Sequence, residues 1–324
     1  MRLAIIISSP LGFPLLHALI RTGAAVEVAV PATNQPEIEE LVGQLAGVDL
    51  VPRRLVRAGL GETLADWIAE WQPSVVLVLT FPWRVPARVL ALPPHGFLNV
   101  HFAALPNYRG PAPLFWQLRN RESVGAVTIH RMEADFDTGA ILLELPVPIG
   151  PDDTYGLHHT NLANRAATLA PQLVALLQLP TGTLPMRAQP EAAAHYWPRP
   201  ALPDLCLQWD TPAAECYALV RAANPWNRGV FALLRGHPIR ILAVQPLPGV
   251  AHEHPPGTVL RADAQAGVLV ACGSGEVLRL EMVLLAEGYF TGFQLISLGL
   301  QVGERLGTLP VAGAAMGRAV AALV

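Results

Sequence analysis

Residues 97–139 read FLNVHFAALPNYRGPAPLFWQLRNRESVGAVTIHRMEADFDTG, and this stretch decides how the rest of the chain is interpreted. Residues 97–101 are a strand-like run, and Asn99 and His101 share one of its faces because side chains alternate along a strand. Asp137 lies in a loop after a second strand-like run, residues 126–132. We expect the two strand ends to bring Asn99, His101 and Asp137 together.

These three side chains suit the transfer of an acyl group to an amine. That reaction passes through a tetrahedral oxyanion, which the amide of an Asn can stabilise. The attacking amine must lose a proton and the leaving nitrogen must gain one, and a His supported by a carboxylate can move both. On residue type alone the other interpretation stays open, because such residues more often serve as structural hydrogen-bond partners or turn formers.

The first half of the chain alternates buried strands with helices. Apolar, β-branched runs at residues 3–7, 26–30 and 75–79 are typical of parallel strands covered on both faces. Helical patterns occupy residues 13–23, 37–45 and 60–71, a further strand is expected at 48–51, and one long helix at 154–177. This alternation predicts an α/β fold with a Rossmann-like parallel sheet, whose ligands bind at the carboxyl ends of the strands.

The second half predicts a different architecture. Short strands separated by Gly, Pro and Asp follow residue 230, which indicates a small OB-like β-barrel. We therefore predict a catalytic domain at 1–188, a proline-rich linker at 189–204, a C-terminal β-barrel domain at 205–310 and a tail at 311–324.

Composition narrows the function classes. The formal net charge of −3 argues against a surface built to hold a polyanion. All 22 basic residues are arginine, which excludes Schiff-base chemistry on lysine. The 3 cysteines have neither disulfide nor metal-site spacing, so we expect buried thiols, no metal and a cytoplasmic protein. The apolar run at the N-terminus is too short to span a membrane, so no membrane association is expected.

Read together, these motifs resemble the folate-dependent formyltransferases. Residues 99–113, NVHFAALPNYRGPAP, are similar to the family signature Asn-x-His-x-Ser-Leu-Leu-Pro-x-Tyr-Arg-Gly, and residues 135–139, DFDTG, to its Asp-Thr-Gly loop. Residues 196–226 resemble the join between the catalytic and C-terminal domains of methionyl-tRNA formyltransferases. Ala103 departs from the pattern, because the family usually has Ser there, and a hydroxyl that would help order the site is missing.

The resemblance implies a role for each residue. Asn99 would hold the formyl oxygen, His101 would assist proton transfer at the amine, and Asp137 would orient or charge the His. Thr128 either hydrogen-bonds that carboxylate or is an ordinary strand residue. Arg109 either holds an anionic part of a substrate or fixes its own turn. The implied formyl donor is 10-formyltetrahydrofolate, with contacts in two loops, at Phe81, Trp83 and Val85 and at Glu133, Ala134 and Asp135.

The acceptor is interpreted from charge. In the tRNA enzymes the segment after the second strand is rich in Lys and Arg, but here residues 31–47 read PATNQPEIEELVGQLAG, with Glu37, Glu39 and Glu40. Phosphate contacts need positive charge, so a small-molecule amine is favoured, such as an amino sugar nucleotide or an amino acid derivative, with methionyl-tRNA as the alternative. Hydrolysis of 10-formyltetrahydrofolate and a non-catalytic folate-binding protein stay open as further alternatives.

Overall fold

The computed structural model describes residues 1–32, 38, 40, 42 and 51–310. They divide into two compact units. The first unit comprises Met1–Pro113, Ser123–Ile149 and His158–Pro198, and the second comprises Leu114–Glu122, Gly150–Leu157 and the chain from Arg199 onward. Across this described part of the chain, no helix combines the length and the apolar character needed to cross a membrane.

The first unit contains a seven-stranded sheet in the order β3-β2-β1-β4-β5-β6-β7. Its strands are β1 (Arg2–Ile7), β2 (Ala25–Pro31), β3 (Arg53–Leu55), β4 (Val75–Leu79), β5 (Phe97–His101), β6 (Val124–Arg131) and β7 (Ile141–Pro148). The pairings from β3 to β5 are parallel, whereas β6 and β7 are added antiparallel. The predicted α/β fold with a mainly parallel sheet is confirmed.

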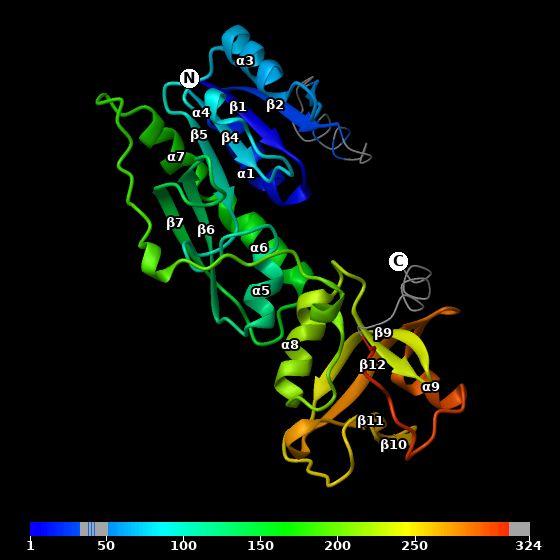
Figure 1. Cartoon of the computed structure of the whole chain (residues 1–324). Coiled ribbons are helices and arrows are strands. Elements are labelled where there is room, and N and C mark those ends of the chain that lie inside the picture. The colour runs from blue at the N-terminus through cyan, green and yellow to red at the C-terminus, as the bar shows by residue number, and fades with distance from the viewer. Residues whose placement is uncertain (33–37, 39, 41, 43–50, 311–324) are drawn as a thin grey trace. The chain divides into compact units, whose positions relative to one another are not determined.

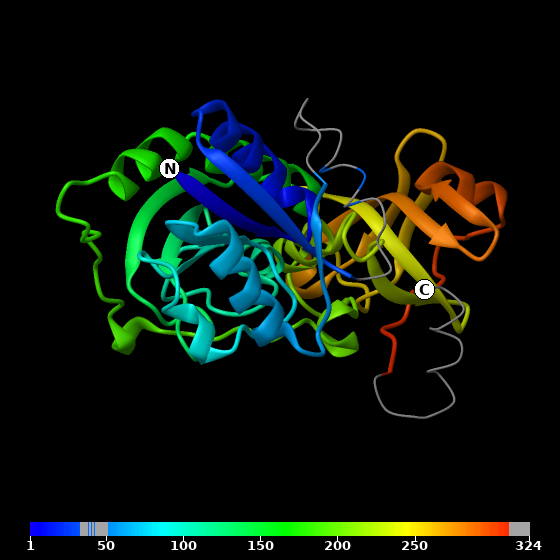
Figure 2. The ribbon, with the colours of Figure 1, turned by 90° about the horizontal axis from the view of Figure 1, so that it is seen from above.

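Helices cover both faces of this sheet. Figure 2 shows α1 (Phe13–Arg21) and α3 (Leu60–Trp71) on opposite sides of β1 and β2. The apolar stripe of α3 packs against Ala4 and Ile6, which share one face of β1 because they are two residues apart. Further helices in the described residues of this half are η1 (Pro10–Gly12), α4 (Ala87–Leu90), α5 (Pro113–Arg119), α6 (Tyr155–Ala167) and α7 (Ala170–Leu177).

Two of the expected elements fall mainly outside the described residues, and a third differs from the structure. The structure has β3 at Arg53–Leu55, whereas residues 48–50 of the strand expected at 48–51, and most of the helix expected at 37–45, lie outside the described residues. The single helix expected at 154–177 is wrong, because α6 ends at Ala167 and α7 begins at Ala170. Pro171 lies in the first turn of α7 and has no N–H to continue a helix from the preceding turn.

The second unit carries an antiparallel sheet in the order β10-β11-β12-β9-β8, with β13 paired to β12. This confirms a C-terminal domain built of antiparallel strands. Its elements are α8 (Ala213–Ala223), β8 (Val230–Leu234), β9 (His237–Pro246), β10 (Val259–Asp263), β11 (Gly267–Ala271), η4 (Gly273–Gly275), β12 (Val277–Leu285), β13 (Gly288–Thr291) and α9 (Gly292–Ser297), preceded by η3 (Leu202–Leu205).

Residues 187–197, which we call the strap, follow α7 and belong to the first unit. In Figure 1 the green chain after α7 runs down alongside β7. Arg187 forms an isolated β-bridge with Ile141, and Tyr196 forms another with Arg109. The strap includes η2 (Glu191–Ala193). Proline-rich sequence thus lies against the loops that follow β5 and β6.

Candidate active site

The structure brings Asn99, His101 and Asp137 together in the first unit. Asn99 and His101 lie on β5, and Asp137 lies in the loop between β6 and β7. The Asn99 Nδ2 is 3.4 Å from the Asp137 Oδ1, and the His101 Nδ1 is 3.6 Å from the same oxygen. The His101 and Asp137 side chains are 7% and 11% exposed, so the cluster is largely shielded from water but still reachable.

The tautomer of His101 follows from its second ring nitrogen. The Nε2–H of His101 donates to the carbonyl of Tyr108 at 2.6 Å. In the neutral ring Nδ1 is therefore unprotonated, and it faces Asp137. Burial lowers the pKa of His101, and the carboxylate of Asp137 opposes that shift only in part. His101 is therefore a neutral base at neutral pH, with Nδ1 available for a proton.

Asp137 is fixed through both its side chain and its backbone. The N–H of Gly110 donates to Asp137 Oδ2 at 2.9 Å, and Asp137 adopts a left-handed backbone with φ of 59°. Burial would raise the pKa of this carboxyl, but interactions with His101, His130 and the Gly110 N–H outweigh it and hold the pKa well below its usual range. Asp137 is consequently ionised and can stabilise a protonated His101.

A second histidine, His130, belongs to the cluster and was not singled out from the sequence. It lies opposite Asn99 in the β5–β6 register and is 1% exposed. Its Nδ1–H donates to the carbonyl of Arg131 at 2.8 Å, so its Nε2 accepts from Asn99 Nδ2 at 3.1 Å. This contact orients the Asn99 amide. The available signal was alternation, because His130 is two residues beyond Thr128.

Thr128 and Arg109 make different contacts from those considered in the sequence. The Thr128 hydroxyl is buried and donates to the carbonyl of Ala103 at 2.7 Å, not to Asp137. The Arg109 guanidinium binds the side chains of Gln189 and Glu191, not the carbonyls of its own turn. Its side chain is 7% exposed, so in this conformation it is not open to a substrate anion.

The two loops expected to contact the formyl donor lie next to each other. Arg84 forms an ion pair with Asp135 at 3.1 Å, and its guanidinium lies 5.2 Å from the centre of the Phe136 ring. Phe81 and Trp83 are half-buried and meet edge to face, with ring centres 5.3 Å apart. Val85 instead packs in the core and is 4% exposed. Glu133, Ala134 and Asp135 are exposed.

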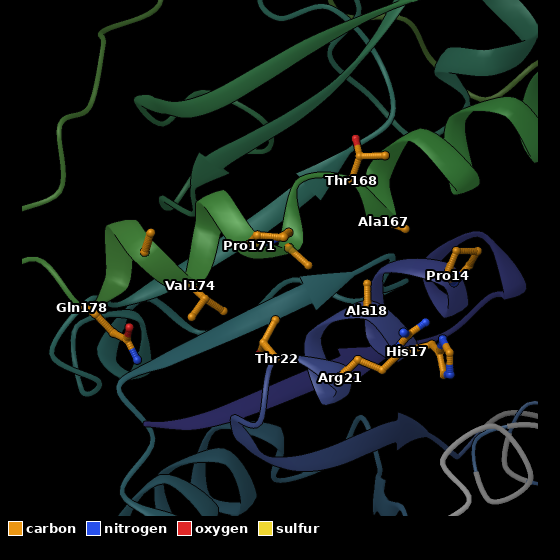
Figure 3. Close-up of a pocket in the computed structure, with 12 residues that line it drawn as sticks. Pro14, His17, Ala18, Arg21, Thr22, Ala167, Thr168, Pro171, Val174 and Gln178 are labelled. Carbon is orange, nitrogen blue, oxygen red and sulfur yellow. The ribbon is translucent and has the colours of Figure 1, made fainter.

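A cavity of about 820 Å³ lies elsewhere in the first unit, between α1 and α7 (Figure 3). Residues of the Asn99–His101–Asp137 cluster do not line it. Its walls combine apolar and polar side chains, including Pro14, His17, Arg21, Thr168, Pro171, Val174 and Gln178. Within the described residues no group of His, Cys, Asp or Glu is arranged to hold a metal ion. The polar cluster, not this cavity, is therefore the candidate site.

Comparison with known proteins gives two family matches. Residues 2–175 match the model described as formyl transferase, and residues 203–289 match that of the formyl transferase C-terminal domain. A methionyl-tRNA formyltransferase of Aromatoleum aromaticum is 37% identical over 217 residues, which cover 67% of this chain and 66% of that relative. That of Geobacter metallireducens is 30% identical over 311 residues, which cover 91% of this chain and 94% of the relative.

Solved structures share the fold at lower identity. WlaRD, described as a sugar 3N-formyl transferase crystallised in the presence of dTDP and 5-N-formyl-THF, is superimposable with a TM-score of 0.63. The sequences are 15% identical, and the match covers 86% of this chain and 96% of that chain. This likeness concerns the fold, and the family matches confirm the resemblance drawn from residues 97–139.

Proposed function

Because the chain belongs to the formyl transferase family, we propose that it transfers a formyl group from 10-formyltetrahydrofolate to the amino group of methionyl-tRNA. The relatives from Aromatoleum and Geobacter that carry this name support the acceptor, and the second of them aligns through both domains. The charge argument for a small acceptor rests on the net charge of −3 and on Glu37, Glu39 and Glu40, of which Glu37 and Glu39 lie outside the described residues.

The observation that carries the proposal is that Asn99 Nδ2 and His101 Nδ1 both lie within 3.6 Å of one oxygen of Asp137, Oδ1. The amine nitrogen attacks the formyl carbon, and the carbonyl electron pair moves onto the formyl oxygen. Asn99 stabilises this oxyanion by donating from Nδ2. The contact of Nδ2 with Asp137 is long, at 3.4 Å, so that hydrogen can turn to a closer oxyanion, while His130 keeps the amide oriented.

Proton transfer falls to His101. Its Nδ1 accepts the proton that the amine loses on attack, since Nε2–H is committed to the Tyr108 carbonyl. The ionised Asp137, 3.6 Å away, stabilises the imidazolium that results. The same proton then passes to N10 of the folate as its bond to the formyl carbon breaks, which releases tetrahydrofolate. One proton leaves the amine and one reaches N10, so the reaction balances without a metal.

The donor is assigned to the two adjoining loops. Phe81 and Trp83 offer half-buried aromatic surface of the kind that packs against a flat pterin ring, and the Arg84–Asp135 ion pair links their loop to the loop of Asp137. Glu133, Ala134 and Asp135 contribute exposed backbone and side-chain groups beside it. The side chain of Val85 is buried, so it supports this surface from the core and does not contact the donor directly.

The test is a transfer assay with 10-formyltetrahydrofolate and separate acceptors. We expect the purified protein to form formyl-methionyl-tRNA and to release tetrahydrofolate in equal amount. The second candidate, a small-molecule amine, is favoured by the net charge of −3 and by the acidic residues Glu37, Glu39 and Glu40. Faster turnover on an amino sugar nucleotide than on methionyl-tRNA would select it, and tetrahydrofolate release without any acceptor would indicate a hydrolase instead.

A further inference from the structure

We propose that Gln189 in the strap is a positioning residue that holds the Asp137 loop in its reactive conformation. The inference rests on the proposed role of Asp137 in formyl transfer. Gln189 lies 52 residues beyond Asp137 in the sequence, within the proline-rich stretch that follows α7. It therefore places part of the site's geometry outside residues 97–139, which carry the reacting groups.

The amide of Gln189 is fully engaged. Its Nε2 donates to the carbonyl of Asp137 at 2.8 Å and to that of Gly139 at 2.7 Å. Its Oε1 accepts from Arg109 Nε at 3.2 Å and from Arg109 Nη2 at 3.0 Å. These are the two donors and two acceptor positions that a glutamine side chain has. A flipped amide would set oxygen against two carbonyls, so only one orientation satisfies all four.

Arg109 closes the connection back to the carboxylate. Its guanidinium also makes a two-pronged contact with Glu191 of the strap, at 3.0 Å and 2.9 Å. Its backbone is held by the strap as well, because its N–H donates to His195 and its carbonyl accepts from Trp197. The next residue, Gly110, donates its N–H to Asp137 Oδ2. Gln189 thus binds the backbone carbonyl of Asp137, and the Gly110 N–H, in the turn that the strap holds, binds its carboxylate.

The backbone of Asp137 explains why these contacts matter. Its φ of 59° lies in the left-handed region, which Asp enters more readily than most residues but still at some energetic cost, so hydrogen bonds that hold the backbone there stabilise the loop. The Gln189 donors stabilise the two carbonyls on either side of Thr138 in this conformation. Without them we expect the loop to sample other conformations, in which the carboxylate moves away from His101 Nδ1.

The first test compares Gln189→Ala, Gln189→Glu and the control Gln178→Ala, which removes another first-unit glutamine at the α1–α7 cavity. Loss of the hydrogen bonds from Gln189 to the Asp137 loop should lower kcat by about 10- to 100-fold, the cost expected when a reacting group is displaced by about 1 Å. KM for both substrates should stay within about twofold. Gln189→Glu can still accept from Arg109 but cannot donate to the two carbonyls. It should therefore be as impaired as Gln189→Ala, whereas Gln178→Ala should match the unmodified protein.

A double-mutant cycle separates positioning from any independent role. If Gln189 acts through Asp137, adding Gln189→Ala to Asp137→Ala should cost no further rate beyond about twofold. Equal losses in the two backgrounds would overturn the inference, as would an unmodified kcat in Gln189→Ala.

A third measurement does not depend on activity. Amide hydrogen exchange at residues 135–139 should become faster in Gln189→Ala and Gln189→Glu, with exchange in β1 and β4 unchanged as the check on folding. Unchanged exchange at 135–139 overturns the inference. If the unmodified protein transfers no formyl group to any acceptor, the proposed function fails, and hydrogen exchange still decides whether Gln189 holds the loop.

Discussion

At the scale of single residues, Asn99 is the group that stabilises the oxyanion in the proposed mechanism. Its Nδ2 is directed toward Asp137 and held by His130, and it is the amide donor at this point of the cluster. We expect Asn99→Ala to lower kcat by about 10²- to 10³-fold, the usual cost of losing one oxyanion donor. Steady-state kinetics with 10-formyltetrahydrofolate and methionyl-tRNA measure this, with circular dichroism to check folding. A rate near that of the unmodified protein would remove Asn99 from the mechanism.

His101 makes a prediction about pH. Burial lowers its pKa, so the neutral base persists to lower pH than for an ordinary His, whose pKa is about 6.5. The acid limb of kcat/KM against pH should therefore lie below about pH 6.5. The effect of pH on stability has the same direction. Because the pKa of His101 is higher in the unfolded chain, that chain takes up the proton first, and the free energy of unfolding falls as the pH drops below about 6.5. An acid limb above pH 6.5, or an NMR titration of His101 there, would contradict this.

His130 is expected to act through Asn99. In His130→Ala the half-buried Nδ2–H of Asn99 loses its acceptor, whereas the Oε1 of Gln in His130→Gln can still accept from it. We expect kcat to fall about tenfold in the Ala variant, equivalent to about 1.4 kcal/mol, and less in the Gln variant. Similar kinetics in the two variants would mean that His130 does not orient the amide.

At the scale of elements, the turn after β5 fits closely beneath the strap. A Cβ at Gly110 would lie 2.1 Å from the carbonyl oxygen of Trp197, and its φ is +114°. We expect Gly110→Ala to lower the free energy of unfolding of the first unit by about 1–3 kcal/mol or more, and to lower activity with it. Denaturant unfolding measures the loss.

Gly182→Ala is the matched control for that experiment. Gly182 also has a positive φ, +64°, but a Cβ there would meet nothing within 4 Å. Its cost should be only that of the backbone conformation, about 1 kcal/mol. Equal destabilisation of the two variants would show that the contact with Trp197 is not what constrains Gly110.

At the scale of the whole molecule, net charge constrains how an RNA acceptor could bind. The chain carries a net charge of −3, and its cationic contacts to phosphate must come from arginine, a protonated histidine or the N-terminus. Counterion release should make KM for methionyl-tRNA rise by about tenfold or more between 50 and 200 mM salt, while KM for the folate donor changes by about twofold at most. A KM for methionyl-tRNA that stays constant as the salt concentration rises would argue against phosphate contacts.

The sequence by itself determined the chemistry and the main architecture. Strand alternation placed Asn99 and His101 on one face, and the runs of buried strands and helices specified the parallel sheet, because both depend on residues close together in the chain. The break between α6 and α7 is also local, since Pro171 in the first turn of α7 has no N–H to continue a helix from the preceding turn.

Only the tertiary structure decided the contacts that set the site's geometry. His130 contacts Asn99, 31 residues away in the sequence, through the register of β5 and β6, and Gln189 contacts Asp137, 52 residues away. Periodicity carries no information about such pairs, because their meeting depends on how the sheet is ordered and where the chain returns after α7. The sequence thus predicted the groups that the proposed reaction uses, and the fold decided what holds them in place.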